Sequence, residues 1–228
     1  MILHPPRWSN RYQAGLELAE RLKTSAGRDH DSTVIGLPWG GVPVAVAIGR
    51  QLRLPVATWS VRKVADPLQP ELAIGAISAG KVAVWRNGQA AVRCQEQALS
   101  QGWLQLQERE LERRQKLFCD PSPKQLRNRH LIVVDDGIAT GMTVRAALLS
   151  LRQAEPRSIT LAIPVADRAV ASQLRQLVDQ LEILVLVEQL QSVGMWYGTF
   201  NQLEDREVLD LLAAGTYPKR PNEITPCP

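Results

Sequence analysis

Residues 131–144 read L-I-V-V-D-D-G-I-A-T-G-M-T-V. The apolar residues 131–134 predict a buried strand, and a helix is predicted over residues 141–153. Two adjacent carboxylates, Asp135 and Asp136, stand where the apolar run ends, and small residues follow them. Small residues let backbone N–H groups turn toward an anion, and the start of a helix adds unpaired donors with a partial positive charge. The stretch therefore predicts a strand, a phosphate-binding loop and a helix.

The side chains of this loop support the same interpretation. Thr140 and Thr143 carry hydroxyls that can donate hydrogen bonds to phosphate oxygens. The paired carboxylates suit either two vicinal hydroxyls or a magnesium ion held partly through water. A plain strand–turn–helix with one Asp or Thr as the helix cap does not account for two carboxylates in a row. No Gly-Lys-Ser/Thr follows, so the loop is not a Walker loop.

Strands and helices alternate along the rest of the chain. Further strands are predicted at residues 33–37, 55–61, 159–165 and 181–187, and a hairpin at 72–78 and 82–85 with Ala79-Gly80 as its turn. Further helices are predicted at residues 11–24, 42–52, 89–118, 169–178 and 204–212. Near-continuous apolar strands between helices predict an α/β fold, in which helices cover both faces of a parallel sheet. Ligands of such sheets bind at the carboxyl ends of the strands.

Length, charge and cysteine content narrow the class of protein. A chain of 228 residues suits one α/β domain, predicted over residues 1–215, with a long helix insertion at 89–118 and a loose proline-rich tail at 216–228. The formal charge of +4 suits an anionic ligand, but no block of like charge indicates nucleic acid. No apolar run is long enough to cross a membrane. Three scattered cysteines show no disulfide framework, so we expect a cytoplasmic protein.

Two further loops are expected at the same edge of the sheet. Pro38-Trp39-Gly40-Gly41 follows the first strand, and adjacent glycines allow close backbone approach to a ligand, although a plain tight turn is the better explanation of this loop taken alone. Arg62 and Lys63 follow the second strand. Two interpretations of this basic pair stay open: the side chains bind phosphate oxygens, or they are ordinary solvated surface residues. Residues 64–74, which include Glu71, are expected to form a mobile loop.

Residues 133–143, V-V-D-D-G-I-A-T-G-M-T, resemble the signature of type I phosphoribosyltransferases for 5-phosphoribosyl-1-diphosphate (PRPP). Arg11, Ala14-Gly15 and residues 71–77, 164–166 and 193–197 are similar to one subgroup, the predicted bacterial phosphoribosyltransferases of unassigned substrate. The resemblance implies a Rossmann-like sheet with a small hood. It also implies that Asp135 and Asp136 hold the ribose hydroxyls. The PRPP-binding residues would be Asp135, Asp136, Gly137, Ile138, Ala139, Thr140, Gly141, Met142 and Thr143.

The same resemblance implies an activity, the transfer of a phosphoribosyl group from PRPP to a nitrogen acceptor such as a nucleobase, with release of pyrophosphate. Mg²⁺ would be the cofactor, with Asp135 and Asp136 as metal ligands, in part through water. The catalytic residues would be Asp135, Asp136, Arg62, Lys63 and Glu71, and the pyrophosphate loop Pro38, Trp39, Gly40 and Gly41. A homodimer is common among similar enzymes.

Two points stay open in the sequence. Trp39 stands where many relatives carry Arg or Lys, which motivates an alternative function, a non-catalytic PRPP- or nucleotide-sensing regulatory protein on the same fold. Trp196, Tyr197 and Phe200 are candidates for an acceptor hood, because aromatic faces stack on a flat base. Packing of the last helix onto the body explains these aromatic residues better. The sequence does not name the acceptor.

Overall fold

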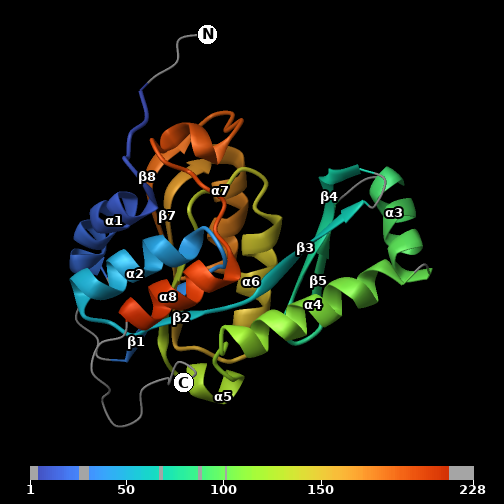
Figure 1. Cartoon of the computed structure of the whole chain (residues 1–228), viewed down its shortest axis with the longest axis horizontal. Helices are drawn as coiled ribbons and strands as arrows, with labels where there is room; N and C mark the ends of the chain where they lie inside the picture. The colour runs from blue at the N-terminus through green and yellow to red at the C-terminus, as the bar shows by residue number, and fades with distance from the viewer. Residues whose placement is uncertain (1–4, 26–30, 67–68, 87–88, 101, 216–228) are drawn as a thin grey trace.

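A five-stranded parallel sheet lies at the centre of the computed structural model, which describes residues 5–25, 31–66, 69–86, 89–100 and 102–215 (Figure 1). The strand order is β2-β1-β6-β7-β8. Its strands are β1 (Ser32–Gly36), β2 (Val56–Thr58), β6 (His130–Val134), β7 (Ser158–Asp167) and β8 (Gln180–Val187). Every neighbouring pair in this sheet is parallel, which confirms the predicted α/β fold.

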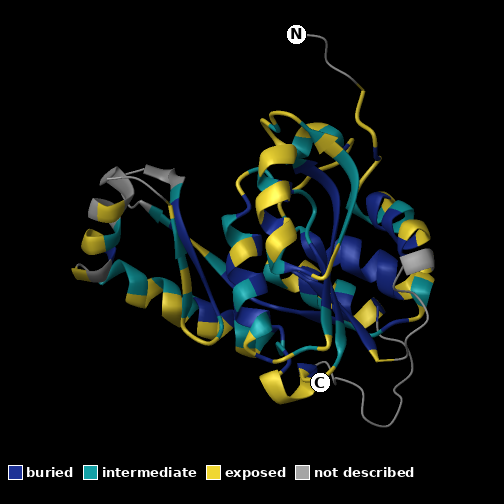
Figure 2. Ribbon diagram, turned by 180° about the vertical axis from the view of Figure 1, so that it is seen from behind, coloured by how far each residue is buried: buried dark blue, intermediate teal, exposed yellow. Residues whose placement is uncertain are grey.

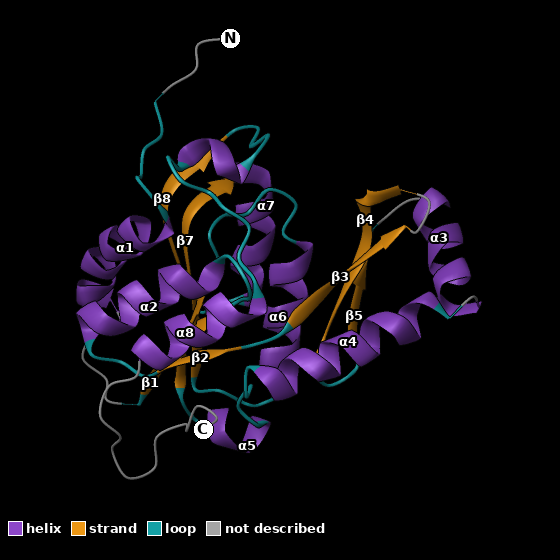
Figure 3. Cartoon of the chain, in the orientation of Figure 1, coloured by secondary structure: helices purple, strands orange, loops and turns teal. Residues whose placement is uncertain are grey.

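Helices cover both faces of the parallel sheet (Figure 3). α1 (Arg11–Ser25) and α2 (Gly41–Leu52) pack on one face, and α6 (Met142–Arg152) and α7 (Arg168–Leu174) on the other. Neighbouring residues of β1 show this division, because Val34 joins the apolar cluster with α1 and α2 while Ile35 joins the cluster with α6. Both faces of β1 are therefore buried, and all five of its residues are buried, including the polar Ser32 and Thr33.

Short elements and the last helix complete this body. α8 (Asp205–Gly215) packs on the outer side of α2, where Val208 and Leu212 meet Val42 and Val46. The remaining elements are α5 (Pro123–Leu126) and two 3₁₀ helices, η1 (Arg175–Leu177) and η2 (Val193–Trp196). Most of the deeply buried residues lie in the parallel sheet and on the inner sides of its helices (Figure 2).

A second, antiparallel sheet projects from the side of this body (Figure 1). It contains β3 (Val61–Asp66), β4 (Gln69–Ser78) and β5 (Val82–Trp85), and it is followed by α3 (Gln89–Ser100) and α4 (Trp103–Leu117). We call this unit, residues 61–117, the arm. The arm has an apolar cluster of its own, built from Val64, Ile74, Ile77, Ala98 and Leu111.

The arm differs from the sequence prediction in two respects. The segment predicted as a loop at residues 64–74 lies in strands where it is described, because Val64 pairs with Gly75 and Ala65 with Ala73 in the antiparallel sheet. The helix predicted over residues 89–118 is two helices, separated at Gly102, whose φ of 79° is left-handed. The hairpin that turns at Ala79-Gly80 is confirmed.

Cys119, just after α4, is disulfide-bonded. This bond contradicts the expectation that the cysteines form no bridge. In the described ranges, no helix is both long and apolar enough to span a membrane. The compartment and the domain boundaries stay predictions, and the tail predicted at residues 216–228 lies outside the described residues.

Candidate active site

The loops after β1 and β6 meet at one edge of the parallel sheet and form the floor of the candidate site. Asp135 and Asp136 follow β6, and Gly40 and Gly41 follow β1. A Cβ atom on Gly40 would lie 2.0 Å from Oδ2 of Asp136, and one on Gly41 would lie 2.4 Å from the carbonyl oxygen of Val134. Neither position has room for a side chain, so the loop at residues 38–41 packs directly against the acidic pair.

The backbone after Asp136 encloses a cup of about 150 Å³. Residues 137–144 line it, together with Lys63 from β3 and Val193 from η2. The N–H of Ile138 donates to the carbonyl of Val165 at 2.9 Å, which fastens the loop to β7. Gly141 then caps α6 in the left-handed conformation, with a φ of 71°. These contacts fix the curvature of the loop without using its inward-facing donors.

The remaining donors of the cup are available to a ligand. Within the described residues, the N–H groups of Gly137, Ala139, Thr140 and Gly141 donate to no protein acceptor. The first backbone bond of the helix runs from Arg145 N–H to the Gly141 carbonyl at 2.8 Å, so the amides of the first turn also lack partners. Several unpaired donors and a helix N-terminus around a small space suit a phosphate group.

The acidic pair beside the cup is held in place by three contacts. The Asp136 N–H donates to Oδ1 of Asp135 at 2.9 Å, and Nε of Arg11 donates to Oδ2 of Asp136 at 2.7 Å. The Tyr197 hydroxyl donates to the backbone carbonyl of Asp136 at 2.5 Å. Burial raises the pKa of both carboxyls. The neighbouring charge of Asp136 raises the pKa of Asp135 further, whereas Arg11 opposes the rise at Asp136.

A family model described as "Phosphoribosyl transferase domain" matches residues 7–189 of the chain. The chain belongs to this phosphoribosyl transferase family. Its matched segment contains the acidic pair, residues 137–144 of the cup and the whole arm, whereas η2 and the residues after it, Tyr197 included, lie outside the match.

Relatives agree with this membership. A candidate phosphoribosyl transferase of Mycobacterium tuberculosis is 34% identical over 208 residues, which are 90% of this chain and 46% of that protein. The chain thus spans about half the length of this relative. The crystal structure of the protein TT1426 from Thermus thermophilus is similar with a TM-score of 0.72 and 30% identity, over 92% of this chain and 100% of that one. The AQ2163 protein of Aquifex aeolicus shares the fold alone, with a TM-score of 0.51 and 9% identity over 82% and 85% of the chains.

The basic pair predicted for a phosphoribosyl transferase site is divided between two surfaces. Lys63 is exposed and lines the cup. Arg62 turns to the arm, where its Nε donates to Oε1 of Gln107 at 2.7 Å. Successive residues of a strand point to opposite faces, and this alternation separates the two cations. Glu71 lies in β4, and its side chain is outside the described residues.

The loop predicted as the pyrophosphate loop contains a cis peptide bond between Pro38 and Trp39. The Trp39 indole N–H donates to Oδ1 of Asp205 at 2.9 Å, and the Arg114 guanidinium lies 4.0 Å from the centre of its ring. The indole therefore belongs to a contact with α4 and α8. The Gly41 N–H donates to the Leu37 carbonyl at 3.0 Å, whereas the Gly40 N–H has no protein acceptor among the described residues.

The aromatic residues predicted as a hood are mostly used in packing. Tyr197 is buried and stacks with Phe200 at 5.2 Å between ring centroids, and Trp196 lies 6.3 Å from Trp8. Phe200 is 36% exposed, and the Arg11 guanidinium lies 3.7 Å from its ring centre. Trp196 and Tyr197 thus pack against Trp8, and of the three residues Phe200 is the most exposed.

Arg11 is the site residue for which the sequence gives no functional reason. Besides its ion pair with Asp136, its Nη1 donates to the carbonyl of Asn201 at 2.9 Å. It joins the start of α1, the acidic pair and the segment after η2. Because Arg11 and Asp136 are 125 residues apart, no local pattern could pair them.

Proposed function

We propose that this chain transfers the 5-phosphoribosyl group of PRPP to a nitrogen acceptor, a nucleobase or a related compound, with release of pyrophosphate. The observation that carries the proposal is the cup of unpaired amides directly beside two carboxylates. A sugar phosphate needs donors for its phosphate and acceptors for its vicinal hydroxyls, and this site offers both in adjacent positions. Membership of the phosphoribosyl transferase family supports the same assignment.

Each part of the site has a role in this proposal. The cup holds the 5-phosphate, and Asp135 and Asp136 accept hydrogen bonds from the two ribose hydroxyls. Lys63, which lines the cup, adds positive charge for the phosphate groups of PRPP. In the reaction, the bond between C1 and the pyrophosphate oxygen breaks and a bond from C1 to the acceptor nitrogen forms. The protein contributes mainly by positioning the two reactants and by stabilising charge.

Magnesium is a further part of the proposal. Among the described residues, no group of three or more His, Cys, Asp or Glu side chains could hold a metal on its own. Mg²⁺ is commonly bound by one or two carboxylates together with substrate oxygens and water, and Asp135 and Asp136 fit that pattern. When bound, the ion would offset the charge of the leaving pyrophosphate.

One observation favours a second candidate, a non-catalytic protein that senses PRPP or a nucleotide. Trp39 supplies no cation to the loop at residues 38–41, and its indole is engaged by Asp205 and Arg114. An arginine placed at position 39 would enter this contact, where Arg114 would repel it. Trp39→Arg would therefore not supply a cation to the loop at residues 38–41, and its effect on pyrophosphate release would not show whether catalysis has been lost.

Turnover separates the two candidates. Pyrophosphate release is measured with PRPP, Mg²⁺ and a panel of nucleobases, and PRPP binding is measured by calorimetry on the same preparation. A transferase releases pyrophosphate only in the presence of its acceptor. PRPP binding without pyrophosphate release in the presence of any tested acceptor would support the sensor. The absence of PRPP binding would contradict both candidates.

A further inference from the structure

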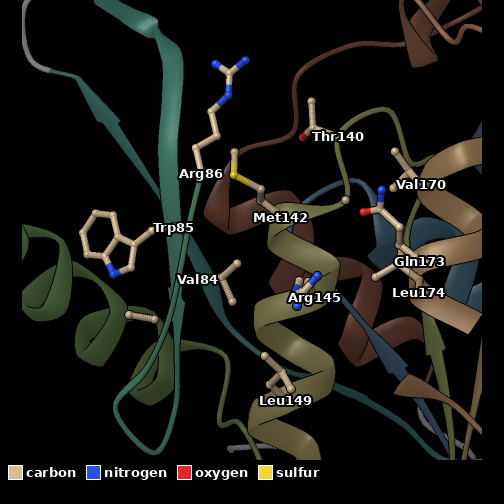
Figure 4. Close-up of a pocket in the computed structure, with 12 residues that line it drawn as sticks. Val84, Trp85, Arg86, Thr140, Met142, Arg145, Leu149, Val170, Gln173 and Leu174 are labelled. Carbon is tan, nitrogen blue, oxygen red and sulfur yellow. The ribbon is translucent and has the colours of Figure 1, made fainter. Parts of the chain in front are cut away.

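A second pocket, of about 440 Å³, lies beside the cup between the arm and the body (Figure 4). Its walls come from the end of β5, from the first turns of α6 and from α7. We call it the arm pocket. Its volume is in the range of small-molecule sites and is sufficient for a ligand of nucleotide size. The roles assigned above do not include it, although Thr140, Gly141 and Met142 line both this pocket and the cup.

The arm pocket carries positive charge without compensation. Its lining contains two arginines, Arg86 and Arg145, and no acidic residue. Both arginines are exposed, and in the described part of the chain neither guanidinium forms a hydrogen bond or an ion pair. Some exposed arginines elsewhere, such as Arg113 and Arg168, are paired with carboxylates, and others, such as Arg109, are not paired among the described residues. Arg86 and Arg145 differ from Arg109 because they line one pocket together. Two unpaired guanidiniums around one pocket favour an anionic ligand, because the planar group binds phosphate in a bidentate way.

Backbone contacts hold the main chain that carries each of the two arginines. The Arg86 N–H donates to the Ile74 carbonyl at 2.9 Å, which holds its main chain on the arm sheet. Arg145 lies in the first turn of α6, whose N-terminus adds a partial positive charge. Figure 4 shows Arg86 extending upward from the end of the strand, with Met142 below it, and Arg145 on α6 farther down the pocket. The hydroxyl of Thr140 and the amide of Gln173 supply further polar groups without described partners.

Between these polar groups the lining also holds apolar side chains. Val84, Met142, Leu149 and Leu174 lie along its floor, and the Trp85 ring turns away to pack with the arm helices. Figure 4 shows the Trp85 side chain on the far side of the strand from α6. The pocket thus combines an apolar surface with a cationic rim, which suits a ligand with an organic part and a phosphate part.

The arm pocket and the cup share a wall. Thr140, Gly141 and Met142 line both spaces, so one short segment separates their occupants. Two phosphorylated ligands on either side of such a wall would repel each other, because the screening length at physiological ionic strength is about 8 Å. They would also compete for the same helix N-terminus. Occupancy of one space should therefore weaken binding in the other.

We propose that the arm pocket binds a phosphorylated small molecule of nucleotide size, and that its occupant lowers the affinity of the cup for PRPP. Only the second part rests on the proposed function. The pocket would then be an inhibitory effector site, placed between the arm and the phosphate loop.

Calorimetry with ATP and GTP as probes tests the binding site, because neither nucleotide is a substrate or a product of the proposed transfer. We expect at least one of them to bind the wild-type chain, and adenosine or guanosine, which lack phosphate, to bind much more weakly. The double variant Arg86→Ala/Arg145→Ala should lose affinity roughly tenfold, because two charge-assisted contacts disappear. Both side chains are exposed, so an unchanged melting temperature will show that the variant is folded.

Two control variants test whether the nucleotide binds in the arm pocket. Arg109→Ala/Lys124→Ala removes two exposed cations outside the pocket and should leave nucleotide affinity unchanged. Ala139→Leu fills the cup without touching the lining of the arm pocket, and it should likewise retain nucleotide binding. The proposal is overturned if neither nucleotide binds, if binding survives the loss of Arg86 and Arg145, if Ala139→Leu abolishes it, or if the phosphate-free nucleosides bind equally well.

The coupling is tested by titrating PRPP in the presence and absence of the nucleotide that binds. We expect a loss of PRPP affinity of about fivefold in the wild type and none in Arg86→Ala/Arg145→Ala. Equal PRPP affinity with and without the nucleotide would refute the inhibitory role. A chain that binds the nucleotide in the arm pocket but never binds PRPP would refute the transferase proposal and leave the pocket assignment standing.

Discussion

Asp120 packs against the end of β2. Its carboxylate accepts hydrogen bonds from the Thr58 hydroxyl at 2.8 Å and from the Ser60 N–H at 2.6 Å. Burial raises the pKa of Asp120 to about 6, although these hydrogen bonds oppose the rise. An unfolded chain releases this proton near pH 4. Over the window from about pH 4 to 6 the folded state therefore binds more protons, and this residue makes stability fall as pH rises.

Asp120→Asn should remove this pH dependence while it keeps an oxygen acceptor for Ser60. We expect the free energy of unfolding of the wild type to decrease relative to the variant by up to about 3 kcal/mol between pH 4 and 6. Urea unfolding of both proteins at intervals of half a pH unit measures the difference. Parallel pH profiles for the two proteins would show that Asp120 titrates normally.

Arg11 and Asp136 form an ion pair whose side chains are only 11% and 14% exposed. Loss of one partner leaves the other charge poorly solvated, and we expect Arg11→Gln to destabilise the fold by on the order of 2 kcal/mol. Asp136→Asn in the same background should restore much of this loss. A double-mutant cycle from urea denaturation gives the coupling energy, and strictly additive changes would contradict a direct interaction.

At the scale of elements, the loop after β1 is fixed by its glycines. Gly40→Ala would place a Cβ atom 2.0 Å from Oδ2 of Asp136, so the acidic pair or the loop must move. We expect PRPP affinity to fall roughly tenfold, since a misplaced carboxylate loses its hydroxyl partner. Gly102→Ala is the matched control, because its Cβ would meet only Oε1 of Gln105 at 3.6 Å.

The control should cost about 1 kcal/mol of stability, because Gly102 has a left-handed φ, and it should leave PRPP binding unchanged. Calorimetric titration of both variants with PRPP and Mg²⁺ makes the comparison. Equal affinities for Gly40→Ala and the wild type would show that the loop at residues 38–41 does not support the acidic pair.

The elements differ in how far sequence reasoning could predict them. Strands with a continuous apolar run, such as residues 131–134, are predictable because burial on both faces dictates their composition. The shape of the loop at residues 137–144 is predictable for a different reason, since its residues are contiguous. The strand at residues 61–66 is not, because its pairing with β4 involves polar residues and irregular register at Ala65 and Asp66. The position of Arg11 in the site could not be predicted either, because only the folded chain brings it next to Asp136.

At the scale of the whole molecule, Trp39 joins three parts that are distant in sequence. Its indole contacts Asp205 of α8 and Arg114 of α4, and Arg113 of the same helix pairs with Asp205 at 2.6 Å. The base of the arm is thereby attached to the body next to the candidate site. Because the indole is engaged by these two residues, we expect its role to be structural.

Trp39→Phe should therefore separate stability from binding. The variant keeps an aromatic ring under Arg114 and loses the hydrogen bond to Asp205, and we expect a destabilisation of roughly 1 kcal/mol. PRPP affinity should stay within about twofold of the wild type, because the lost contact lies outside the site. Thermal unfolding and calorimetry measure the two quantities, and an intact fold that no longer binds PRPP would contradict this role.

The central claim is that the amides of residues 137–143, together with Asp135 and Asp136, bind a sugar phosphate. Calorimetric titration of PRPP with Mg²⁺ into the wild type, Ala139→Leu and Asp135→Asn/Asp136→Asn tests it most directly. The claim predicts that PRPP binds to the folded wild type and that its affinity falls at least about tenfold in each variant. Ala139→Leu blocks the cup for the phosphate, and Asp135→Asn/Asp136→Asn removes the carboxylates that accept from the ribose hydroxyls. Unchanged PRPP affinity in both folded variants would contradict it.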